Sequence, residues 1–202
     1  MTARKTLSFV LATASIVLVA ITLASAQHDG KFHERFDDPA KWSKSFDDPA
    51  RDKWQMPGRV IAALALPSNA VVADIGAGTG YLAARLARHL KDGIVYAVDI
   101  EKAMVDHLAE RAKASGLGNL RAVLGTTTAA NLPEPVDLVV LLNVYHHVEK
   151  RPAYFKRLRT SLKPGGRVAI IDYRPEAPRG APKHMRLAVE KIDEEMQLAG
   201  YA

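Results

Sequence analysis

The residues with the clearest chemical signal are a glycine-rich loop and an aspartate that follows it. The loop, residues 74–80, reads DIGAGTG and joins an apolar run to an amphipathic segment. Glycines let the chain turn tightly and let a ligand approach the backbone, and the free N–H groups of the next helix favour a negative group. Asp99 closes the next apolar run, 19 residues after Gly80, where a carboxylate can accept both hydroxyls of a ribose. This order predicts a nucleoside-binding site rather than a glycine turn beside a surface aspartate.

Tyr81 distinguishes between two classes of nucleoside ligand. The dinucleotide fingerprint needs a third glycine at this position, because the helix must pack closely on the strand beside a pyrophosphate. The chain has tyrosine there. A nicotinamide cofactor, and with it an oxidoreductase activity, is therefore disfavoured.

Apolar runs and amphipathic segments alternate along the chain after residue 56. Strands are predicted over 70–75, 94–98, 120–124, 136–142 and 167–173, and helices over 57–66, 81–91, 103–115, 152–162 and 183–199. Alternation of this kind predicts an α/β fold with a doubly wound, mostly parallel sheet covered on both faces. Ligands of such sheets bind beyond the carboxyl ends of the strands, where the glycine loop and Asp99 should lie.

Three motifs carry a family resemblance over about residues 54–201. DIGAGTG, the strand VYAVD that ends in Asp99, and LKPGGRVAIID resemble the class I S-adenosylmethionine-dependent methyltransferases. The resemblance implies a Rossmann-like fold and S-adenosyl-L-methionine as the cofactor. It further implies these contacts: the methionine part against Gly76, Gly78 and Gly80, with Asp74 supporting their loop, the ribose hydroxyls on Asp99, and the adenine beside Ile100.

Two features depart from that family. Members often place an acid after the third strand to bind the adenine amino group, whereas here Thr126 offers an uncharged hydroxyl. Members also continue from the equivalent of residues 194–201 into two more strands, and this chain stops at Ala202. We therefore expect the edge beside the fifth strand to be open to water or to pair with a second copy of the chain.

Asn143, His146 and His147 follow the fourth predicted strand, and the two histidines are the candidate catalytic residues. Methyl transfer from a sulfonium is an in-line displacement on an activated donor, so most of the catalysis can come from holding the acceptor in line. A base is needed only when the acceptor must lose a proton, and histidine suits that role near neutral pH. General-base catalysis, contact with substrate or cofactor, and structural hydrogen bonding all stay open for the pair. Asn143 is equally suited to orienting the cofactor and the substrate.

Composition narrows the possible partners. The 202 residues are 48% hydrophobic and contain no cysteine, so one domain with a core is expected, without disulfides or a thiolate metal site. His28 and His33 lack the spacing of metal ligands, and no metal is predicted. The net charge of +6 is scattered, which argues against nucleic acid as the partner. The loop 174–183 carries Arg174 and Arg179, which could attract an anionic substrate, or else is a semi-rigid connector.

Residues 1–26 have the features of a signal peptide. Two basic residues precede an apolar run over 7–23, and Ala24-Ser25-Ala26 fits the cleavage rule. Export to the periplasm or the extracellular space is expected, with an uncleaved membrane anchor through 7–23 as the alternative. Residues 27–56 then form a helical lead-in, in which two Asp-Asp-Pro sequences begin helical turns, and residues 57–202 form the methyltransferase domain.

The sequence as a whole thus predicts an exported methyltransferase that acts on an unidentified small-molecule acceptor. A non-catalytic nucleoside-binding or interaction protein on the same fold is the alternative. The threonine loop, the short C-terminus and export away from the compartment that makes the cofactor favour that alternative.

Overall fold

A five-stranded parallel sheet forms the centre of the computed structural model, which describes residues 35–202 of the chain. Its strands are β1 (Val71–Ile75), β2 (Ile94–Asp99), β3 (Leu120–Leu124), β4 (Val136–Leu142) and β5 (Leu162–Ile171). They lie in the order β3-β2-β1-β4-β5, and every neighbouring pair is parallel. The order reverses between β1 and β4, so the predicted doubly wound α/β class is confirmed. The predicted signal peptide lies outside the described residues.

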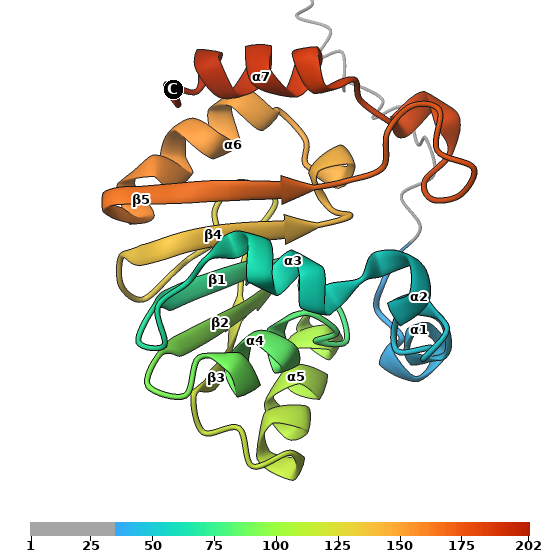
Figure 1. Cartoon of the computed structure of the whole chain (residues 1–202), viewed down its shortest axis with the longest axis vertical. Helices are drawn as coiled ribbons and strands as arrows, with labels where there is room; N and C mark the ends of the chain where they lie inside the picture. Colours follow the sequence, from blue (N-terminus) through green and yellow to red (C-terminus); the bar gives the residue numbers. More distant parts are fainter. Residues whose placement is uncertain (1–34) are drawn as a thin grey trace, which may run out of the picture. The chain divides into compact units, whose positions relative to one another are not determined.

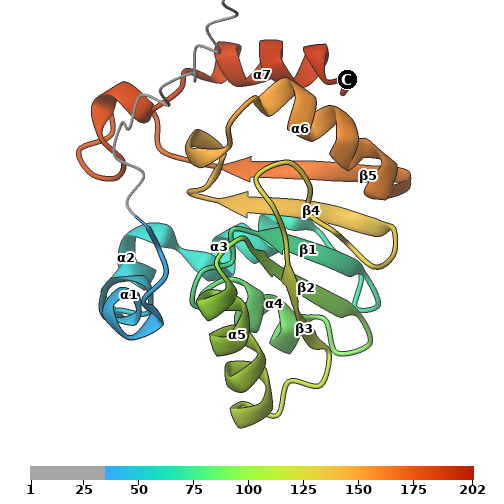
Figure 2. The same ribbon diagram turned by 180° about the vertical axis from the view of Figure 1, so that it is seen from behind.

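Helices cover both faces of the sheet (Figures 1 and 2). On one face lie α3 (Pro57–Leu64), α4 (Ala83–His89) and α5 (Lys102–Ala114), and on the other α6 (Arg151–Leu158) and α7 (Val189–Leu198). The alternation of side chains along β4 explains these two layers, because Leu138 and Val140 pack into the first and Val139 and Leu141 into the second. Short 3-10 helices follow β4 (η1, Tyr145–His147) and α6 (η2, Arg159–Ser161) and precede α7 (η3, Lys183–Met185).

The lead-in contributes two helices, α1 (Pro39–Phe46) and α2 (Arg51–Gln55), beyond the carboxyl ends of the strands (Figure 1). Asp38 caps α1 by accepting a hydrogen bond from the backbone N–H of Lys41 at 3.0 Å. Asp48 accepts from the backbone N–H of Ala50 at 2.8 Å, just before α2 begins. Each Asp-Asp-Pro sequence therefore does begin a helical turn, as predicted.

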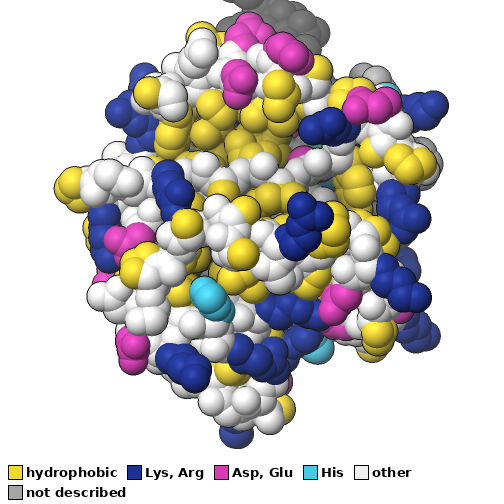
Figure 3. Space-filling model, in the orientation of Figure 1, with side chains coloured by type: hydrophobic (Ala, Val, Ile, Leu, Met, Phe, Trp, Pro, Cys, Tyr) yellow, Lys and Arg dark blue, Asp and Glu magenta, His cyan; other side chains and the backbone are white. Residues whose placement is uncertain are grey.

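The outer edge of β5 pairs with no other strand within residues 35–202. Figure 3 shows hydrophobic side chains gathered in the hollow between α7 and β5. Both elements also contribute half-buried apolar side chains to the core cluster on the α6 face, including Val168 and Ile170 of β5 and Ile192 and Met196 of α7. β5 is thus an edge strand of the sheet in the described part of the chain, and its pairing with a second copy stays a prediction.

Candidate functional site

The glycine loop lies at the carboxyl end of β1 and is closely packed. Gly76, Gly78 and Gly80 have φ angles of +69°, +54° and +90°, a region that side chains rarely adopt. A Cβ on Gly76 would fall 2.6 Å from both methyl groups of Val144, which follows β4. Glycine is therefore required at Gly76 both by its backbone conformation and by the approach of the next loop.

Asp99 turns its carboxylate toward this loop from the end of β2. Its Oδ2 accepts a hydrogen bond from the backbone N–H of Gly78 at 2.8 Å, and its Oδ1 accepts from Glu101 at 3.0 Å. The side chain is buried, and burial raises the pKa of Asp99 against the lowering effect of these bonds. The backbone N–H of Ile100 also acts on this carboxylate, which has about four lone-pair sites and so keeps capacity for a further hydrogen bond.

The residues after β2 and β3 extend this edge. Ile100 is 53% exposed and offers an apolar surface next to Asp99. The backbone N–H of Gly125 donates to the carbonyl of Asp99 at 2.9 Å, which brings the threonine loop to the same edge. Within that loop, the Thr126 hydroxyl accepts from the backbone N–H of Ala129 at 3.0 Å and is exposed.

Asp74 lies beneath the glycine loop, in β1 at the centre of the sheet. Its side chain is almost completely buried, and this desolvation raises its pKa to about 7. A backbone hydrogen bond from Ala83 and the positive charge of Arg51 act in the opposite direction without cancelling the effect. The residue predicted to support the loop is thus a carboxyl group that holds its proton up to neutral pH.

The lead-in helices rest directly on this edge. A Cβ on Gly78 would lie 3.3 Å from the ring of Phe46, so the last residue of α1 covers the glycine loop. At the end of α2, Gln55 accepts a hydrogen bond from the Asn143 side chain at 2.7 Å. Asn143 itself has a φ of +59°, which is uncommon for a residue other than glycine. The side-chain nitrogen of Asn143 therefore positions α2 over the end of β4.

Aromatic side chains of the lead-in pack on one another and on the domain. Phe36 lies 4.6 Å from Trp42 and 5.5 Å from His147 between ring centroids, and Trp42 stacks on Phe46 at 5.2 Å. This aromatic cluster joins α1 to the residues that follow β4.

His146 and Asp172 form a buried pair where β4 and β5 end side by side. The Nδ1 atom of His146 lies 2.8 Å from both carboxylate oxygens of Asp172, and only 4% and 10% of the two side chains are exposed. Asp172 also accepts hydrogen bonds from the backbone N–H groups of His146 and Tyr173. A carboxylate on Nδ1 keeps the proton of a neutral imidazole there, which leaves the Nε2 lone pair as the basic atom. No other described residue forms a hydrogen bond with Nε2. His147 stacks on the His146 ring at 4.2 Å between centroids.

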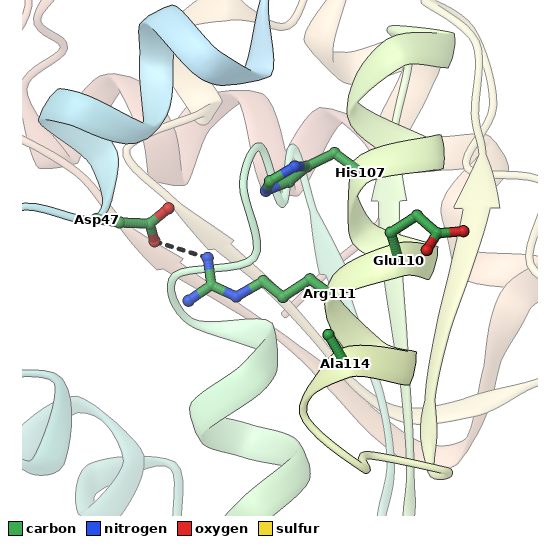
Figure 4. Close-up of a pocket in the computed structure, with 5 residues that line it drawn as sticks. All are labelled: Asp47, His107, Glu110, Arg111 and Ala114. Atoms are coloured by element: carbon green, nitrogen blue, oxygen red, sulfur yellow. Dashed lines mark hydrogen bonds and ion pairs between the residues drawn. The ribbon is translucent and has the colours of Figure 1, made fainter.

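An open pocket of about 490 Å³ lies between α1 and α5, beside rather than over the glycine loop. Figure 4 shows the ion pair that crosses it, in which Nη1 of Arg111 lies 2.8 Å from Oδ1 of Asp47. The same nitrogen donates to the carbonyl of Thr79 in the glycine loop. This ion pair fastens the lead-in to the loop.

Comparison with known proteins gives consistent results. A family model described as a methyltransferase domain matches residues 72–166. An uncharacterized methyltransferase of Mycobacterium bovis, Mb0092, is 33% identical over 115 residues, which are 56% of each chain. This chain therefore spans just over half the length of that relative.

Two solved structures resemble the fold. A methyltransferase from Aquifex aeolicus that depends on S-adenosylmethionine has a TM-score of 0.73 and 27% identity, over 81% of this chain and 88% of that one. The O-methyltransferase NcsB1 of neocarzinostatin biosynthesis has a TM-score of 0.64 and 22% identity, over 81% and 53%. It was solved with S-adenosyl-L-homocysteine and 1,4-dihydroxy-2-naphthoic acid.

Proposed function

We propose that the chain is a class I S-adenosylmethionine-dependent methyltransferase that transfers the methyl group of S-adenosyl-L-methionine to a small-molecule acceptor. The observation that supports this most strongly is the hydrogen bond between Gly78 of the glycine loop and the Asp99 carboxylate. It brings the two parts of a nucleoside site together at the carboxyl edge of a doubly wound sheet.

The residues at this edge fit the cofactor. The Asp99 carboxylate accepts from backbone N–H groups and keeps acceptor capacity for a ribose hydroxyl, and the exposed side chain of Ile100 would flank the adenine. Gly76, Gly78 and Gly80 present bare backbone at this edge, and the Phe46 ring of the lead-in lies over Gly78, where it would contact the methionine part. The bound group supplies a methyl carbon already activated on a sulfonium.

We propose that His146 is the general base and that Asp172 positions it. Asp172 holds the ring by Nδ1, so Nε2 can take the proton of an acceptor hydroxyl as the acceptor oxygen bonds to the methyl carbon. Val144 packs on Gly76, which places this histidine two residues from a contact with the glycine loop. The remaining work of the site is to hold the acceptor in line and exclude water, for which the lead-in helices are well placed.

A small acceptor agrees with the surroundings of the site. The fold neighbour NcsB1 binds 1,4-dihydroxy-2-naphthoic acid, a compact hydroxylated aromatic. The lead-in helices and their aromatic side chains cover the edge beside Gly78 and His147, which suits an enclosed ligand better than a polymer. Binding without turnover is the alternative, supported by a Thr126 hydroxyl that is bonded within its own loop.

Asp99→Asn is expected to weaken the binding of S-adenosyl-L-homocysteine by about tenfold or more. Asparagine keeps the size of the side chain but removes the charge that strengthens the ribose hydrogen bonds. Titration calorimetry on the folded variant measures the effect. Asp92→Asn, at an exposed position before β2, is the matched control and should bind like the wild type. Wild-type affinity in a folded Asp99→Asn protein would remove the ribose assignment.

We also propose that residues 1–26 direct export. Within the described residues, no helix is long and apolar enough to cross a membrane, and residues 7–23 lie outside that range. Fractionation of the native host with N-terminal sequencing should find a protein that begins at Gln27 outside the cytoplasm. A membrane-bound chain that retains residues 7–23 would support the uncleaved anchor, and a cytoplasmic chain starting at Met1 would contradict export.

A further inference from the structure

Arg51, in α2 of the lead-in, is a half-buried arginine that has no ion pair with any residue in the described part of the chain. Of its three side-chain nitrogens, only Nη1 donates a hydrogen bond within this range, to the carbonyl of Phe46 at 2.9 Å. Nε is buried and has no hydrogen-bond partner among residues 35–202. Buried N–H groups are nearly always hydrogen-bonded, so an unpaired one calls for a ligand or an ordered water.

The guanidinium of Arg51 lies beside the glycine loop. Its central carbon is 3.8 Å from the ring centroid of Tyr81, which directly follows Gly80, and 5.9 Å from that of Trp54. The loss of hydration on burial lowers the pKa of Arg51, against the attraction of Asp74 and Asp47. The protein thus keeps a cation at the site without giving it a carboxylate of its own.

Arg85 shows that this arrangement is not a general property of the arginines here. Its central guanidinium carbon lies 4.1 Å from the centroid of the same Tyr81 ring, but both oxygens of Asp52 accept hydrogen bonds from it at 3.0 Å. Two arginines therefore contact one ring, and only Arg85 has a carboxylate partner within the described residues.

We propose that Arg51 binds a carboxylate of the ligand in the cofactor site. A guanidinium presents its N–H groups in a planar fork that matches a carboxylate, and Nε, with no partner in the chain, is one side of that fork. The position beside the glycine loop favours the carboxylate of the amino-acid part of the cofactor, while an acidic acceptor is the other source of the same chemistry. The proposal rests on the proposed function.

Titration calorimetry with two nucleosides tests whether Arg51 binds the carboxylate of the cofactor's amino-acid part. S-adenosyl-L-homocysteine carries the amino-acid carboxylate, and 5′-methylthioadenosine lacks it. Arg51→Gln should weaken the binding of S-adenosyl-L-homocysteine by about tenfold or more and change the binding of 5′-methylthioadenosine by less than about twofold. Arg51→Lys keeps the charge but not the planar fork, so its affinity for S-adenosyl-L-homocysteine should lie between those of the wild type and Arg51→Gln. In the matched control, Arg85→Gln, the ratio of the two affinities should stay that of the wild type.

The second source is tested with 1,4-dihydroxy-2-naphthoic acid against 1,4-dihydroxynaphthalene, both in the presence of S-adenosyl-L-homocysteine. If Arg51→Gln weakens the binding of the acid but not that of 1,4-dihydroxynaphthalene, Arg51 binds the carboxylate of the acceptor. An equal loss of affinity for both compounds of each pair, or no loss of affinity in either the nucleoside pair or the naphthalene pair, would overturn the proposal. Arg51 would then be a packing residue of α2. A wild-type protein that binds neither nucleoside would contradict the proposed function itself, which separates the two failures.

Discussion

Asp74→Asn is expected to make the protein more stable at pH 8, by up to about 4 kcal/mol in the free energy of unfolding. Burial raises the pKa of the folded carboxyl group from an ordinary 3.8 to about 7. Between these values the folded protein keeps a proton that the unfolded chain has lost, so stability falls as pH rises, and the loss is complete above the folded pKa. A shift of about three pKa units corresponds to about 4 kcal/mol. Asparagine does not ionise and avoids this cost.

Urea unfolding of the two proteins between pH 4 and pH 8 measures the difference. The stability gap should be small near pH 4, widen up to about pH 7 and then stay constant, while all other titrating groups cancel in the comparison. Asp193→Asn, at an exposed position of α7, is the control and should shift stability by less than about 0.5 kcal/mol at every pH. A gap that does not change with pH would contradict the raised pKa of Asp74.

The elements of the fold were predictable wherever an apolar run has clear polar ends. β3 and β4 begin and end at the predicted residues. β5 begins at Leu162, five residues earlier than predicted. The chain stays paired with β4 through a register shift near Val136, although this part of β5 contains a proline and two glycines.

The predicted helix over 183–199 is divided into η3 and α7, with Arg186 between them. The Arg186 side chain donates to the carbonyls of Pro175, Ala177 and Ala181, and local helix propensity carries no signal for such contacts.

The candidate site was predictable to the extent that its signals are local. The glycine loop and Asp99 lie in one strand-loop-helix-strand unit, so their meeting at Gly78 follows from the motif. Asp172 was not singled out, although it lies near the carboxyl end of the predicted strand over 167–173. Its pairing with His146 depends on which strands are neighbours, and spacing along the chain does not determine that order.

The contacts that the lead-in makes with the site were even less predictable from the sequence. Gln55 and Asn143 are 88 residues apart in the chain, and neither type nor spacing connects them. Arg51 was not singled out from the sequence. Only the packing of α2 on Tyr81 shows that its guanidinium is held beside the glycine loop without a carboxylate partner. Tertiary contacts, rather than sequence pattern, thus identify the residues that complete the site.

His146→Gln is expected to lower the turnover of a hydroxyl acceptor by about 100-fold to 10,000-fold and to leave the affinity for S-adenosyl-L-homocysteine unchanged. Glutamine fills similar space but does not accept a proton, and Asp172 would lose the ring that it holds at 2.8 Å. Transfer of a labelled methyl group to 1,4-dihydroxy-2-naphthoic acid and to a panel of other phenols measures the rate. His184→Gln, at an exposed position of η3, is the control and should turn over like the wild type.

Asp172→Asn separates a positioning role from a structural one. An asparagine amide has no charge to keep the Nδ1 proton in place, so the fraction of His146 with a basic Nε2 falls and the loss should appear in kcat rather than in KM. Nitrogen NMR of His146 should report a protonated Nδ1 in the wild type and a mixture of tautomers in Asp172→Asn. Turnover by His146→Gln within about threefold of the wild-type rate would show that methyl transfer here needs no base. The His146–Asp172 pair would then only join the ends of β4 and β5.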